Sequence, residues 1–180
     1  GPTTCLGTLE QGLQAHGIRW QDVRHVMLTH IHLDRAGATG TIVRQHPHIT
    51  VLVHERGAKH MIDPSRLLDS ATRLYGSDMD RLWGEFAAVP QASIVSLSGG
   101  ERVEAGGRAF DVAYTPGHAS HHVSYFDASA GVAFVGGSAA GDVGRQRHHA
   151  ALGDRLVEHG AVKVEREGHL ALLGLGLDGG

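Results

Sequence analysis

Cysteine, one-sided charge and long apolar runs are scarce in this sequence of 180 residues. A single cysteine, Cys5, excludes an internal disulfide framework and any zinc module built from cysteines alone. Sixteen basic residues stand against 19 acidic ones, with no basic stripe and few aromatic residues, so nothing indicates a nucleic-acid partner. The longest apolar run, residues 170–177, is far shorter than the about 20 residues that span a membrane.

The remaining composition is that of a folded domain. Hydrophobic residues make up 41% of the chain and charged residues 19%, which is too apolar for disorder. The length suits one domain, so residues 1–180 are predicted to form a single domain. No basic segment followed by an apolar core marks a signal peptide, and on that ground we expect a cytoplasmic protein.

Apolar periodicity predicts helices and strands in alternation, followed by a meander of strands. This order favours layered sheets with helices outside. A loop is expected over residues 31–40. Helices are expected over residues 6–16 (before Gly17), before Pro47, from Asp63-Pro64 to Gly76, from Ser77 to Phe86 and over 146–159; strands are expected over 26–29, 49–53, 92–97, 102–104, 109–114, 122–126, 132–135 and 161–164.

Histidine is abundant, with 15 residues, and the most informative ones follow a predicted strand. His30, His32 and Asp34 occupy alternate positions directly after the strand at 26–29. Because side chains two residues apart point the same way in an extended backbone, His30 and His32 can converge on one cation. Asp34 can serve a second cation or hold a metal-bound water.

An open zinc site needs a third nitrogen, and His118 is the best candidate. It follows the strand at 109–114, and Pro116-Gly117 forces a tight turn that aims its side chain. With 15 histidines, an H-x-H spacing can also arise by chance. Two strand-end loops that both carry histidines favour a metal site over this alternative.

These motifs resemble those of the metallo-β-lactamase-fold hydrolases. Residues 29–37, with the letters THIHLDRAG, resemble the family's metal-binding loop, and residues 115–118 resemble its third-ligand loop. Residues 132–136 resemble the strand that follows, while residues 142–180 match only weakly. The resemblance implies a four-layer αββα sandwich. It also implies one or two zinc ions and hydrolysis of a carbonyl or phosphoryl substrate.

The sequence departs from the family pattern at the second metal. Arg35 stands where many members have a histidine ligand, and Gly137 stands where many have a bridging aspartate. The same comparison implies His169 as a last ligand and places Ser138 where one β-lactamase subclass uses cysteine. His148, His149 and His159 are rivals to His169. The family's N-terminal strand pair is not visible before residue 6, so a truncated sandwich is expected.

The predicted function is zinc-dependent hydrolysis of a small-molecule thioester, lactone or β-lactam. One zinc, or two, would be held by His30, His32, His118, Asp34 and His169, with Asp34 as the catalytic carboxylate. Ser138 and His122 are the predicted substrate contacts. The alternatives are a β-lactamase proper and an inactive, metal-stabilised scaffold. An exposed sheet edge can also pair two copies into a homodimer.

Overall fold

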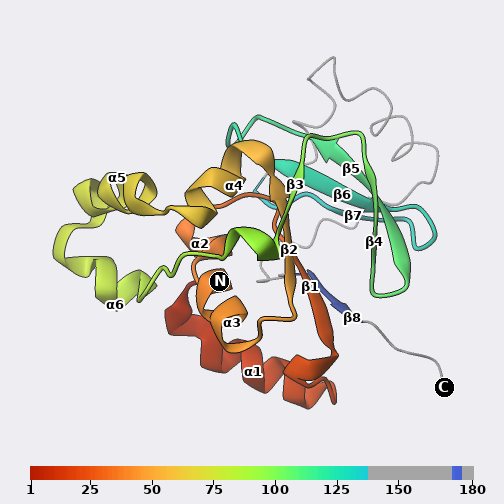
Figure 1. The fold of residues 1–180 in the computed structure, drawn as a ribbon, viewed down its shortest axis with the longest axis horizontal. Coiled ribbons are helices and arrows are strands. Elements are labelled where there is room, and N and C mark those ends of the chain that lie inside the picture. The colour runs from red at the N-terminus through yellow and green to blue at the C-terminus, as the bar shows by residue number, and fades with distance from the viewer. Residues whose placement is uncertain (138–171, 176–180) are drawn as a thin grey trace.

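The computed structural model describes residues 1–137 and the backbone of residues 172–175 (Figure 1). The predicted helix at 146–159 and the predicted strand at 161–164 lie outside the described residues. No helix in the described part of the chain is long and apolar enough to cross a membrane. The helices are α1 (Leu6–Ala15), α2 (Leu33–Ala36), α3 (Thr39–Gln45), α4 (Glu55–Ile62), α5 (Ser65–Tyr75) and α6 (Met79–Trp83).

The strands form two four-stranded sheets. The first has the order β3-β2-β1-β8, in which β1 is parallel to β2, β2 is parallel to β3, and β8 is antiparallel to β1. The second is an antiparallel meander of order β4-β5-β6-β7. The strands are β1 (Val23–Met27), β2 (Thr50–His54), β3 (Ile94–Leu97), β4 (Arg102–Ala105), β5 (Arg108–Tyr114), β6 (Val123–Asp127), β7 (Val132–Phe134) and β8 (Leu172–Leu175).

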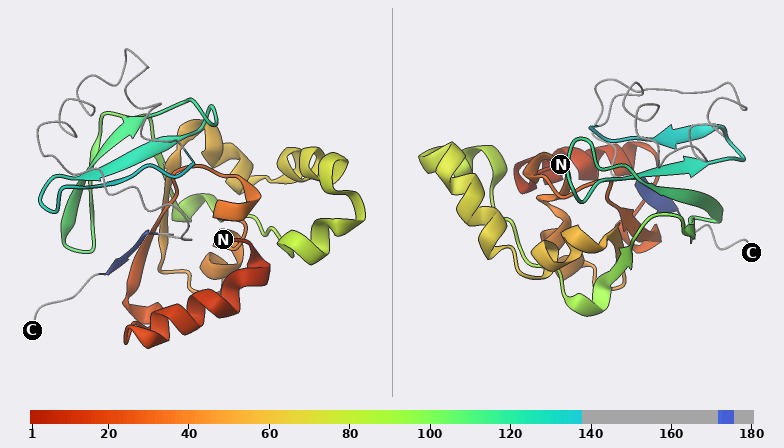
Figure 2. Two further views of the ribbon diagram at one scale, coloured as in Figure 1. Left: turned by 180° about the vertical axis from the view of Figure 1, so that it is seen from behind. Right: turned by 90° about the horizontal axis from the view of Figure 1, so that it is seen from above.

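The layers follow from the alternation of side chains along the central strands. In β1, Val26 faces the helices and Met27 faces the second sheet, and in β2 Val53 and Leu52 divide in the same way. The two sheets therefore pack face to face, with the helices on the other side of the first sheet (Figure 2). The predicted sandwich of sheets and helices is confirmed.

Several local predictions hold because the signals are local. Helix α1 ends at Ala15, and Gly17 takes a φ of 70°, as expected for a glycine just beyond a helix. Helix α5 follows Pro64, whose neighbour Asp63 accepts a hydrogen bond from the Ser65 backbone N–H. Gly76 ends that helix with a φ of 53°.

Other local predictions were wrong where tertiary packing dominates. The expected loop at 31–40 contains α2 and the start of α3, and helix α4 was not anticipated. Helix α6 starts after Asp78 rather than Ser77, and Phe86 lies beyond it in the core. Strand β3 starts at Ile94 and joins the first sheet rather than the meander. Strand β8, within the apolar run at 170–177, was also missed.

Candidate metal centre

The first two histidines of the site leave the central strand of the first sheet. Strand β1 ends at Met27, and His30 follows with 1% of its surface exposed, while His32 is half-buried directly before helix α2. His118 is exposed and lies in the loop between β5 and β6 of the second sheet. The two loops therefore come from different sheets and meet at one edge of the sandwich.

The three imidazoles form a nearly equilateral triangle. The ring centroids are 4.9 Å apart for His30 and His32, 4.7 Å for His30 and His118, and 4.8 Å for His32 and His118. One nitrogen from each ring lies within 4.8 Å of the other two, and Nδ1 of His32 is 3.1 Å from Nε2 of His118. The structure thus brings together the three histidines that the sequence singled out.

Burial keeps two of these rings, those of His30 and His32, in the neutral form. Burial, together with the neighbouring rings of His122, His32 and His118, lowers the pKa of His30 to about 2. Burial and the nearby His118 also lower the pKa of His32. A neutral imidazole has a free lone pair, which is the form that binds a metal ion.

The ring of His30 has a hydrogen-bond partner on one of its two nitrogens. Its Nδ1 is 3.0 Å from Oγ1 of Thr29, so Nε2 is the ring nitrogen left for another partner. When Nδ1 carries the proton and donates to Thr29, the lone pair is on Nε2. Thr29 was not singled out from the sequence, although a hydroxyl directly before the first ligand was a usable signal.

One nitrogen–nitrogen separation in the triangle fits the geometry that zinc requires. Two nitrogens bound at 2.0–2.1 Å in a tetrahedral shell lie about 3.3 Å apart. The 3.1 Å between His32 and His118 is close to this value. Three imidazole nitrogens, one of them on the exposed His118, also match the donor set of an open zinc site.

Asp34 does not converge with the three histidines. Its Oδ2 is 3.1 Å from Nε of Arg35, and both side chains are partly exposed. In the described part of the chain, the three histidines alone form a group suited to a metal ion. A second ion at Asp34 would compete with the guanidinium of Arg35 for the same carboxylate.

His122 is buried in the interior next to the site and does not face solvent. It has 0% of its surface exposed, and its Nδ1 is 2.6 Å from Oγ1 of Thr115. Burial and the nearby rings of His118 and His121 lower its pKa to about 4, while the carbonyl of Val135 acts in the opposite direction. A side chain in this position presents no surface to a substrate, so the structure does not favour the predicted substrate contact.

Two glycines after β7 let the backbone approach the histidines closely. A Cβ on Gly136, whose φ is 55°, would lie 2.9 Å from Nε2 of His122. A Cβ on Gly137 would lie 2.9 Å from Cδ2 of His118. From the sequence, Gly137 was notable only because many family members have an aspartate there. The structure shows in addition that its backbone lies close to the ring of His118. The predicted Ser138 and His169 lie outside the described residues, as do the rivals His148, His149 and His159.

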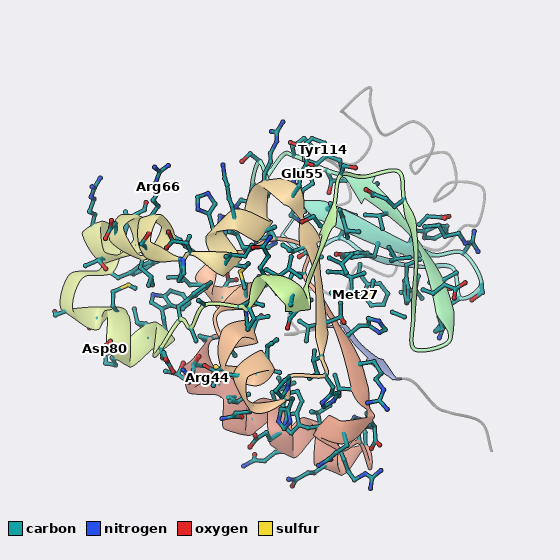
Figure 3. The ribbon with its side chains drawn as sticks, viewed as in Figure 1. Met27, Arg44, Glu55, Arg66, Asp80 and Tyr114 are labelled. Atoms are coloured by element: carbon teal, nitrogen blue, oxygen red, sulfur yellow. The ribbon has the colours of Figure 1, made fainter. Side chains whose placement is uncertain are left out.

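Tyr114 stands at the entrance to the third-ligand loop, beside the start of helix α4, where Glu55 is also labelled (Figure 3). Its ring stacks on His54 with centroids 4.6 Å apart, and its hydroxyl accepts a hydrogen bond from Arg56. The same hydroxyl donates to the carbonyl of Ser120. These contacts tie the loop that carries His118 to the first sheet.

Comparison with known proteins agrees with this geometry. The chain is 29% identical over 104 residues to a metallo-beta-lactamase fold-containing protein, ST1585, of Sulfurisphaera tokodaii. That match covers 56% of this chain and 39% of the relative. The crystal structure of ST1585 from Sulfolobus tokodaii aligns with a TM-score of 0.52 and 28% identity, covering 62% of this chain and 44% of the other.

A second structure aligns over more of the chain. The metallo-beta-lactamase family protein TTHA1429 of Thermus thermophilus matches with a TM-score of 0.58 and 26% identity, covering 75% of this chain and 47% of its own. The chain thus spans less than half the length of these relatives. The sequence pattern of the metallo-beta-lactamase superfamily matches residues 4–154. With the motif loops, the sandwich and this match in agreement, the chain belongs to the metallo-beta-lactamase superfamily.

Proposed function

We propose that the chain carries the site of a zinc-dependent acyl hydrolase in which His30, His32 and His118 hold one ion. The triangle of three imidazoles is the observation that carries the proposal. Membership of the superfamily supports a metal-dependent hydrolase in general. A bound zinc ion would supply Lewis acidity and a water that ionises near neutral pH.

The chain's own residues have separate tasks in this proposal. Thr29 orients His30 when its hydroxyl oxygen accepts a hydrogen bond from the Nδ1–H of the ring, which leaves Nε2 as the ligand atom. Asp34 would accept a proton from the attacking water after its side chain turns from Arg35 toward the histidines, because the observed ion pair holds the carboxylate apart from them. Arg35 also places a permanent positive charge beside the histidines, where negative charge develops during attack on an acyl carbon.

We propose one ion rather than two. Arg35 forms an ion pair with Asp34, the carboxylate that a second ion would need, and Gly137 has no side chain that could bind it. His169 remains a proposed ligand for a second ion together with Asp34, and Ser138 remains a proposed substrate contact. A neutral serine hydroxyl is a weak zinc ligand, which favours the substrate role for Ser138.

The proposed substrates are small molecules with a thioester, lactone or β-lactam bond. Arg35 and Ser138 favour the β-lactam class, because that combination resembles the β-lactamase subclass with an altered second site. The two absent second-site ligands, at Arg35 and Gly137, support the competing proposal of an inactive scaffold that binds metal without turnover. Hydrolysis of a chromogenic β-lactam, a thioester and a lactone, with and without chelator, distinguishes these outcomes.

Metal binding is tested by titrating zinc into chelator-treated protein. We expect one tightly bound ion for the natural sequence and loss of tight binding for His30→Ala and His118→Ala. His16→Ala is the matched control, since His16 is exposed at the end of helix α1 and should leave binding unchanged. Unchanged zinc affinity in His30→Ala, or no zinc binding by the natural sequence, would exclude the proposed site.

A further inference from the structure

The loop carrying His30 and the segment following His118 are joined by three consecutive contacts. The backbone N–H of Val123 donates to the carbonyl of Thr29 over 2.8 Å. The ring of His122 stacks on that of His30, with centroids 5.1 Å apart and planes inclined by 25°. The backbone N–H of Ile31 donates to Nδ1 of His121 over 3.4 Å.

These contacts share one register. As the first segment advances from residue 29 to 31, its partner recedes from 123 to 121, so the two run antiparallel. The first segment follows β1 of one sheet, and the second enters β6 of the other. The contacts therefore link the two sheets at the position where the histidine triangle forms.

His122 is the central member of this link, and it is held from behind. Thr115 Oγ1 is 2.6 Å from Nδ1 of His122 and 3.0 Å from Oγ of Ser124. The backbone N–H of Thr115 also donates to the carbonyl of His122. Thr115 is 4% exposed, and His122 and Ser124 are 0% exposed, so these hydrogen bonds are shielded from water.

The same hydrogen bonds close the loop that carries His118. Thr115 and His122 are the two ends of that loop, and His118 lies between them. The buried imidazole of His122 thus fixes the ends of the loop that carries His118 and also stacks on the ring of His30. A shift of His122 would move His30 and His118 relative to each other.

We propose that His122, held by Thr115, whose hydroxyl in turn contacts Ser124, is a positioning residue that sets the spacing of the three metal-binding histidines. The inference rests on the proposed metal site and assigns His122 a role other than substrate contact. Outer groups that orient metal ligands typically change metal affinity by about 10- to 100-fold when they are removed. The relevant outer group here is the hydroxyl of Thr115.

A matched pair of variants tests this role with cobalt(II) as the probe. Thr115→Val removes the hydroxyl at nearly constant volume, whereas Thr115→Ser keeps it. We expect Thr115→Val to weaken cobalt(II) binding by about 10- to 100-fold and to change the visible absorption spectrum of the bound ion. Thr115→Ser should restore both the affinity and the spectrum.

A control variant separates positioning from general loss of stability. Thr41→Val removes another buried hydroxyl, in helix α3, and should leave cobalt(II) binding unchanged. Thermal unfolding of each metal-free variant reports whether it is folded. If Thr115→Val does not fold, Ser124→Ala, which removes only the outer hydroxyl, takes its place with the same expected direction.

The outcomes distinguish the two proposals. Cobalt(II) binding with natural affinity and spectrum in a folded Thr115→Val protein would overturn the positioning role and leave the metal site standing. Equal weakening in Thr115→Ser would also overturn it, because the hydroxyl would then be irrelevant. Absence of cobalt(II) binding by the natural sequence would overturn the metal site and the positioning role together.

Discussion

Adding one methyl group at Gly137 should weaken metal binding through His118. A Cβ at this position would lie 2.9 Å from Cδ2, 3.0 Å from Nε2 and 3.2 Å from Cγ of the His118 ring. Ordinary carbon contacts begin near 3.4 Å, so the ring of His118 must move by about 0.5 Å. The φ of Gly137 is outside the left-handed region, so alanine adds no backbone strain there.

A displacement of this size is enough to disturb a ligand. Sites need their groups held within about 0.5 Å of the working geometry. We therefore expect Gly137→Ala to raise the dissociation constant for zinc about tenfold, the lower end of the range for changes around a ligand. Tenfold corresponds to about 1.4 kcal/mol of binding free energy.

Two measurements check this value. Competition with a chelator gives the zinc affinity directly. At a fixed zinc concentration above saturation, the rise in Tm caused by zinc should be about 3 to 6 °C smaller in Gly137→Ala than in the natural sequence. The Tm of the metal-free protein should change little, since Gly137 is exposed.

Gly12→Ala is the control for this experiment. Gly12 is exposed in helix α1, where a Cβ would meet nothing within 4 Å. We expect this variant to gain up to about 1 kcal/mol of stability and to keep its zinc affinity. Zinc binding by Gly137→Ala at natural affinity would refute the reasoning, because His118 would then bind from a position other than the one observed.

Two further predictions concern the second sheet. Asp127 is 2% exposed, accepts hydrogen bonds from Ser129 and Ala130, and forms an ion pair with Arg108. Burial alone would raise the pKa of Asp127, but these partners lower it overall. Asp127→Ala should therefore cost about 3 kcal/mol in urea unfolding at pH 7. A carboxyl whose pKa is lowered by folding contributes stability above its unfolded pKa near 3.9, and this contribution is lost as the pH falls through the folded pKa. The difference in unfolding free energy between Asp127→Ala and the natural sequence should therefore shrink below about pH 4. A difference that does not depend on pH would contradict this. Tyr125→Phe removes a buried hydroxyl that donates to the carbonyl of Leu28 over 3.0 Å, and it should lower the free energy of unfolding by about 1 kcal/mol. Tyr75→Phe, at an exposed tyrosine, is the control and should lower it by less than half of that. Equal effects would show that the buried hydrogen bond contributes nothing.

The sequence alone predicted the features that depend on neighbouring residues. The end of helix α1 before Gly17 and the start of α5 after Pro64 follow from local backbone preferences. Likewise, His30 and His32 follow a buried strand, and His118 follows Pro-Gly, so each loop was recognisable by itself. Their convergence was inferred from the motifs and is seen in the structure.

The tertiary structure decided which elements lie next to each other. A period of two indicates a strand, but it does not say which sheet the strand joins, so β3 was placed in the meander although it pairs with β2. The burial of His122 against His30 also depends on a contact between residues 92 positions apart in the chain. Sequence spacing could select the three metal-binding histidines, but only the packing of one sheet on the other shows what holds them at their observed separations.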